Sequence, residues 1–111
     1  MAKDVIVLEF NELTPALVDR FCSEGHLPNF SRLRDRSIVA VTDAEAQFPH
    51  LEPWIQWVTV HTGLSHREHG VFDLSDGPAL KAPRIWDLVS EEGEKVWICG
   101  SMNAAVRGKN I

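Results

Sequence analysis

The segment Leu51–Phe72, LEPWIQWVTVHTGLSHREHGVF, gathers the residue types best suited to chemistry. It holds two tryptophans, three histidines and a Thr62-Gly63 pair that is typical of a helix end. This concentration indicates a functional site. The same stretch has no Ser, Thr or Cys between Phe48 and Val58, where a nucleophile at the start of the segment would stand.

The three histidines of this segment are His61, His66 and His69. Their spacing differs from the i, i+4 pair of a helical zinc site, and no cysteine is near, so we interpret them as independent structural or surface histidines. His50 and Glu52 differ in kind because they lie in a proline-bounded turn before an expected helix. An anion or an activated nucleophile would meet favourable backbone dipoles there.

A second group of polar residues, Glu9, Asn11 and Glu12, lies at the end of the mostly apolar run at residues 5–10. Oxygen ligands at the end of a rigid strand suit a hard divalent cation. Alternatively, Asn11 and Glu12 satisfy only the turn from strand to helix. Both interpretations stay open at the level of residue types.

Hydrophobic periodicity and proline positions predict the elements that would hold these residues. The expected strands are 5–10, 37–42 and 95–100; the expected helices begin at Pro15, Leu27-Pro28, Pro53 and Arg84, and a loop runs over 64–83. The order predicts an α/β fold, a layered and mostly parallel sheet with flanking helices. Ligands of such sheets bind beyond the carboxyl ends of the strands. We expect 1–111 to be the amino-terminal portion of one domain that continues beyond the chain.

Composition excludes several classes. With 11 basic and 16 acidic residues the net charge is −5, which leaves no basic footprint for a nucleic acid. Cys22 and Cys99 form neither a disulfide framework nor a metal knuckle. The apolar run near the amino terminus is too short for a signal peptide or a membrane span, so we expect a cytoplasmic protein without membrane contact. The oligomeric state is not specified by these patterns.

Four segments in order resemble the amino-terminal part of the type I phosphodiesterase/nucleotide pyrophosphatase group, in the alkaline phosphatase superfamily. They are VIVLEFNELTP, LPNFSRL, WVTVHTGLSHREHGVF and IWDLVSEEGEKVWICGSMN. The resemblance implies an alkaline phosphatase-like sheet, of which this chain would hold an incomplete part. It also implies a metal-dependent hydrolase with two zinc-type ions and a Ser or Thr nucleophile, acting on a small-molecule phosphate or sulfate ester.

The chain departs from that family at both functional positions. The family's metal-binding Asp-Gly pair falls on Asn11-Glu12, so the resemblance makes Asn11 a weakened metal ligand. The nucleophile's place falls on Glu52, since Thr59 stands a turn too late. A carboxylate can serve as a nucleophile or as a metal ligand. By the same resemblance the His69-Gly70 pair is a structural element of the loop.

By the same resemblance, the family's other metal ligands lie in later sequence. The resemblance therefore implies a divalent ion, with zinc as the first choice, and the alternative is that these 111 residues alone bind none. The leading hypothesis is a divergent phosphodiesterase- or phosphatase-like hydrolase. A second hypothesis is a non-catalytic binding or scaffold protein that retains the fold. A third is an independent small α/β binding domain.

Overall fold

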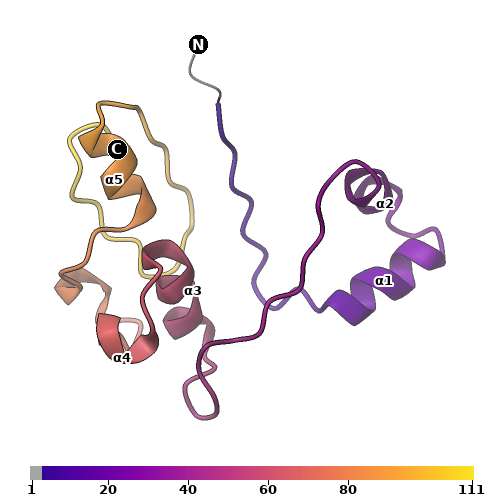
Figure 1. Ribbon diagram of the computed structural model, residues 1–111, viewed down its shortest axis with the longest axis horizontal. Helices are drawn as coiled ribbons and strands as arrows, with labels where there is room; N and C mark the ends of the chain where they lie inside the picture. Colours follow the sequence, from indigo (N-terminus) through magenta and orange to yellow (C-terminus); the bar gives the residue numbers. More distant parts are fainter. Residues whose placement is uncertain (1–3) are drawn as a thin grey trace. The chain divides into compact units, whose positions relative to one another are not determined.

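The computed structural model describes residues 4–111 and divides the chain into two compact units. Unit 1 is Met1–Asp43, described from Asp4 onwards, and unit 2 is Ala44–Ile111. Figure 1 shows the helices of both units in sequence colours. Each unit is described by itself below.

Unit 1 contains two short helices that pack against each other, α1 (Pro15–Ser23) and α2 (Pro28–Arg34). Each begins with a proline, whose fixed φ suits the first helical turn, and Gly25, at φ 79°, follows α1. Both helices were predicted from the sequence and are confirmed. Neither contains a fully buried residue, and Leu33 in α2 is 59% exposed.

Unit 2 carries the remaining helices: α3 (Pro53–Thr62), α4 (His66–His69), the 3-10 turn η1 (Gly77–Ala79) and α5 (Ile85–Glu91). The predicted helices at Pro53 and Arg84 are confirmed as α3 and α5. Gly63 adopts the left-handed φ of 70° that ends α3. A small apolar cluster of Val58, Val71 and Leu80 joins α3 to the segments that follow it.

The segment 64–83, expected to be a loop, contains α4 and η1. Local polar contacts explain this local order. The Ser65 backbone N–H and hydroxyl both donate to the Glu68 carboxylate, at 2.9 and 2.6 Å, which closes the first turn of α4. The Asp76 carboxylate accepts the backbone N–H groups of Phe72 and Asp73 before η1 begins. Sequence periodicity does not register such short elements.

The expected layered, mostly parallel sheet is wrong for this structure, because no strand forms anywhere in residues 4–111. The segments 5–10, 37–42 and 95–100 are irregular, and Figure 1 shows them as plain tube. Most of their apolar side chains face solvent: Ile6 is 82%, Ile38 99% and Trp97 89% exposed.

The physical reason is that a central parallel strand requires neighbouring strands on both edges and helices on both faces. Apolar content and β-branching raise strand propensity but do not supply those neighbours. Around residues 95–100, the backbone bond from Val96 N to Asn110 O, at 2.9 Å, does not extend into a ladder. The crevice expected at the strand ends is therefore absent from the described residues.

No helix in the described part of the chain combines the length and the apolar character needed to cross a membrane.

Candidate functional site

Glu52 stands at the N-terminus of α3, the position that the sequence analysis assigned to the nucleophile. Its backbone is extended, and its carbonyl accepts the N–H groups of Ile55 and Gln56 at 2.9 and 3.0 Å. The residue is exposed and its carboxylate makes no capping hydrogen bond. Because Pro53 has no N–H, the first-turn N–H left outside these bonds is that of Trp54. The Glu52 carboxylate is thus accessible beside the positive end of the helix dipole.

Contacts on both sides fix the start of α3. The Gln56 side-chain amide donates to the carbonyl of His50 at 3.0 Å, which folds the preceding turn back onto the helix. The Trp54 indole N–H donates to the carbonyl of Phe72 at 3.2 Å. The Asn103 side-chain amide donates to the carbonyl of Trp54 at 2.8 Å. Glu52 therefore projects from a backbone that three other segments of unit 2 hold in place.

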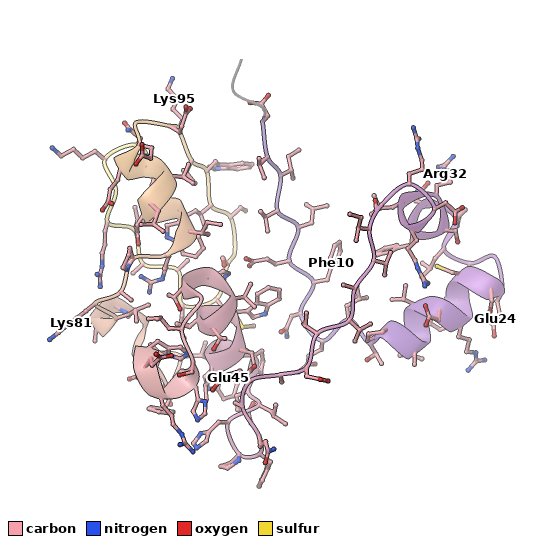
Figure 2. The ribbon with its side chains drawn as sticks, in the orientation of Figure 1. Phe10, Glu24, Arg32, Glu45, Lys81 and Lys95 are labelled. Atoms are coloured by element: carbon pink, nitrogen blue, oxygen red, sulfur yellow. The ribbon has the colours of Figure 1, made fainter. Side chains whose placement is uncertain are left out.

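The exposed Glu45 and the buried His66 form an ion-pair geometry next to this turn. The His66 backbone N–H donates to Glu45 Oε2 at 3.0 Å, and His66 Nδ1 lies 2.9 Å from Glu45 Oε1. Figure 2 labels Glu45 on the segment before α3. The backbone N–H of His66, then its side chain, lower the pKa of the Glu45 carboxyl because these hydrogen bonds favour the ionised form. A carboxylate on Nδ1 sets the tautomer of the imidazole and leaves Nε2 as its second nitrogen.

Aromatic contacts extend this group to His50. The rings of His50 and His66 stack with centroids 5.1 Å apart. The Phe72 ring lies 5.4 Å from the His50 ring and 6.2 Å from the His66 ring. His50 was expected near a site because of its turn, and the structure brings it against His66.

His69 is held differently. Its Nδ1 accepts the Val71 N–H at 3.0 Å, and its Nε2 lies 3.2 Å from the Thr59 hydroxyl. Because Nδ1 acts as an acceptor, a neutral ring carries its proton on Nε2 and donates it to Thr59. Burial lowers the pKa of His69, which favours this neutral form. His69 therefore cannot withdraw a proton from Thr59, so this pair is not an activated nucleophile.

His61 lies on α3 between two tryptophans. Its ring stacks on Trp57 at 5.8 Å and meets Trp86 at 4.7 Å, and the Ser101 hydroxyl is 3.3 Å from its Nε2. His61, His66 and His69 are all buried, each with its own neighbours. The interpretation as independent structural histidines agrees with these contacts, whereas a surface position does not.

Asn11, the predicted metal-side residue, lies in unit 1. It is exposed and occupies a turn with Glu12, whose φ is 55°. Glu52 belongs to unit 2, so the roles given to Asn11 and Glu52 stay predictions.

The metal ions that the resemblance implies require a group of ligand side chains. Among the described residues 4–111, no three His, Cys, Asp or Glu side chains are arranged to hold a metal ion. Structural and catalytic zinc sites use at least three protein ligands. The described residues therefore do not form a complete zinc site by themselves.

Two buried charged residues were missed by sequence reasoning. Arg84 is fully buried, and its Nη2 donates to the carbonyls of Gly77 and Asn103, both at 2.8 Å. Burial lowers the pKa of Arg84. Asp87, three residues into α5, accepts the Arg84 backbone N–H at 2.9 Å, and an acid at that position is a readable helix-start signal. Glu45 had no such signal, because its partner His66 lies 21 residues away.

Comparison with known proteins agrees with the resemblance seen in the sequence. The family model described as type I phosphodiesterase / nucleotide pyrophosphatase matches residues 5–102. Comparisons with curated proteins and with solved structures gave no match. The matched range includes both helices of unit 1 and the site around Glu52. The chain belongs to the type I phosphodiesterase/nucleotide pyrophosphatase family.

Proposed function

We propose that this protein is a divergent hydrolase of phosphate esters, with sulfate esters as the alternative substrate class, and that Glu52 is its nucleophile. The observation that carries the proposal is the accessible Glu52 carboxylate at the N-terminus of α3, inside the range matched by the family model. In the family, as the resemblance implies, a Ser or Thr stands at this place.

The chemistry follows from the carboxylate. A Glu52 oxygen attacks the phosphorus of a small-molecule diester, a new O–P bond forms, and the bond to the leaving oxygen breaks with its electron pair. The product is a mixed carboxylic–phosphoric anhydride on Glu52. Water then attacks the phosphorus, loses a proton, and returns the electron pair to the carboxylate. The free Trp54 N–H and the helix dipole favour negative charge that develops beside the helix start.

A divalent ion, zinc by family resemblance, belongs to the proposal as a cofactor. Asn11 would offer it one amide oxygen, a weaker ligand than a carboxylate because it lacks charge. The described residues do not complete its ligand set, so no step above is assigned to it.

The test compares a variant that restores the family's residues with a variant that removes the Glu52 carboxylate. Asn11→Asp combined with Glu52→Thr restores the family pattern and should raise both zinc binding, measured by calorimetry, and hydrolysis of bis(p-nitrophenyl) phosphate. Glu52→Gln in the otherwise native chain should abolish hydrolysis while leaving the circular dichroism spectrum unchanged. No gain from the double change, together with full activity of Glu52→Gln, would refute the placement of the nucleophile.

The second candidate is a non-catalytic binding or scaffold protein. It is favoured by the lack of a three-ligand metal group among residues 4–111 and by the bonding of Thr59, the nearest hydroxyl on α3, to His69. This candidate predicts no turnover of any ester at any zinc concentration. It also predicts that Glu52→Gln has no effect on whatever the protein binds.

A further inference from the structure

The Glu45–His66 pair has no part in the nucleophilic step described above. His66 is the first residue of α4, and its backbone N–H and Nδ1 both face one carboxylate, that of Glu45. The second carboxylate oxygen also lies 3.0 Å from Nδ1. These two contacts hold the plane of the imidazole ring. Because a carboxylate only accepts hydrogen bonds, Nδ1 must carry the proton, and the neutral ring has its lone pair on Nε2.

The other ring nitrogen of His66, Nε2, lies at the accessible edge of this side chain. Only 10% of the His66 side chain is accessible. Nε2 has no hydrogen-bond partner among the described residues, yet it is not one of the polar atoms sealed from solvent. The small accessible part of His66 therefore includes this nitrogen. A lone pair at the edge of a buried ring is available to a water molecule or to a substrate.

The position of the pair relative to Glu52 follows from His50. The His50 ring stacks on the His66 ring at 5.1 Å, and His50 precedes Glu52 by two residues. Two residues span at most about 7 Å between Cα atoms. Phe72, which contacts both histidine rings, accepts the indole N–H of Trp54 in the first turn of α3. The Glu45–His66 pair thus lies against the turn that leads to Glu52 and the first turn of α3.

We propose that His66 is the general base of the hydrolase, oriented by Glu45 as a positioning residue. This inference rests on the proposed function. Water attacks the phosphorus of the anhydride on Glu52, and its proton passes to His66 Nε2. The bond from phosphorus to the Glu52 oxygen breaks, and its electron pair restores the carboxylate. The proton on Nε2 then leaves to solvent. Glu45 keeps Nδ1–H in place and stabilises the imidazolium formed in the step.

Other ionisable groups surround His66 and enter the pH dependence. They are Glu45 on the preceding segment, His50 on the turn before α3, and Arg67, Glu68 and His69 on α4 itself. Burial lowers the pKa of His69, and its Nδ1 is occupied by Val71, so His69 does not supply the base. His50 lacks a carboxylate partner in the described structure, since Glu45 pairs with His66.

The kinetic test uses His66→Asn, whose amide keeps an N–H donor for Glu45 but has no lone pair in the place of Nε2. It should lower kcat for bis(p-nitrophenyl) phosphate by 10²-fold or more and remove the acidic limb of the kcat–pH profile. Glu45→Gln should lower kcat less, because the imidazolium formed in the step loses its stabilising anion. His26→Gln changes an exposed histidine of unit 1. It is the matched control and should leave the kcat–pH profile unchanged.

A chemical test separates this inference from the proposed function. Diethyl pyrocarbonate acylates unprotonated imidazole nitrogens. Mass-spectrometric mapping should therefore find His66 labelled faster than His61 and His69, which are also buried but whose Nε2 atoms contact the Ser101 and Thr59 hydroxyls. Labelling of His66 should abolish the anhydride-hydrolysis step. If the wild-type chain hydrolyses the diester and His66→Asn hydrolyses it at the same rate, the inference is overturned and the proposed function stands. A wild-type chain with no turnover would overturn both. Failure of His66 to label would overturn the geometry of the pair.

Discussion

Asn103 offers the sharpest test of how unit 2 holds the start of α3. Its side-chain amide donates to the Trp54 carbonyl at 2.8 Å, across 49 residues of sequence. Its backbone adopts φ 52°, in the left-handed region that Asn tolerates better than Ala. Asn103→Ala removes the hydrogen bond and places Ala in this conformation. Asn103→Gly removes the same bond but relieves the conformational cost.

The two contributions can be estimated separately. A hydrogen bond of this kind contributes about 1 kcal/mol, and the left-handed conformation costs Ala about another 1 kcal/mol. Asn103→Ala should therefore lower the free energy of unfolding by about 2 kcal/mol. Asn103→Gly should lower it by about 1 kcal/mol, with a further few tenths from the freer unfolded chain. For a unit of this size, 1 kcal/mol corresponds to a Tm change of about 4–8 °C.

The assay is urea unfolding followed by far-ultraviolet circular dichroism, with the slope m compared among variants. Asn29→Ala, on exposed α2 in unit 1, controls for loss of an amide and should change stability by less than about 0.5 kcal/mol. The reasoning is refuted if Asn103→Ala is as stable as Asn103→Gly, because the left-handed backbone would then carry no cost. It is also refuted if both variants match the wild type.

Two further predictions concern the core and acid stability of unit 2. Val58 is 0% exposed in the central apolar cluster. Val58→Ala removes two buried carbons and leaves a cavity, so it should lower the free energy of unfolding by about 2–3 kcal/mol. A loss under about 1 kcal/mol in the same urea assay would contradict the described packing. The folded-state pKa values of Glu45, Glu68 and His69 are all lowered, the first two by hydrogen bonds and the third by burial. Each lowered pKa contributes stability above the group's unfolded pKa, and this stability is lost as pH falls. The urea midpoint should therefore begin to drop below about pH 6.5 through His69 and drop further below about pH 4.3 through the glutamates. His69→Gln should flatten the first part of this pH profile and Glu68→Gln the second, and unchanged profiles would contradict these assignments.

The helices of this protein could be predicted because their signals are local. Pro15, Pro28 and Pro53 occupy first turns, and Gly63 ends α3 in the left-handed conformation that it alone adopts cheaply. The sheet could not be predicted correctly, since a strand depends on neighbours that an apolar run does not specify. Ile38, 99% exposed, illustrates a strand-like residue that gained no partner.

The site was predictable in part. The position of Glu52 before α3 followed from Pro53, and the separate roles of the histidines followed from their spacing. The Glu45–His66 pair could not be predicted, because it joins residues 21 apart through a fold that periodicity does not describe. Arg84 was missed for a related reason: an arginine is expected on the surface, and the carbonyls of Gly77 and Asn103 that accept its hydrogen bonds lie 7 and 19 residues away in the sequence.

The most direct test of the central claim is rapid acid quenching of the protein during turnover of bis(p-nitrophenyl) phosphate, followed by peptide mass mapping. The account predicts a phosphoryl adduct on the peptide that contains Glu52, absent from Glu52→Gln and accumulating in His66→Asn. Turnover with no adduct on that peptide, or with the adduct on a hydroxyl such as Thr59, would contradict it.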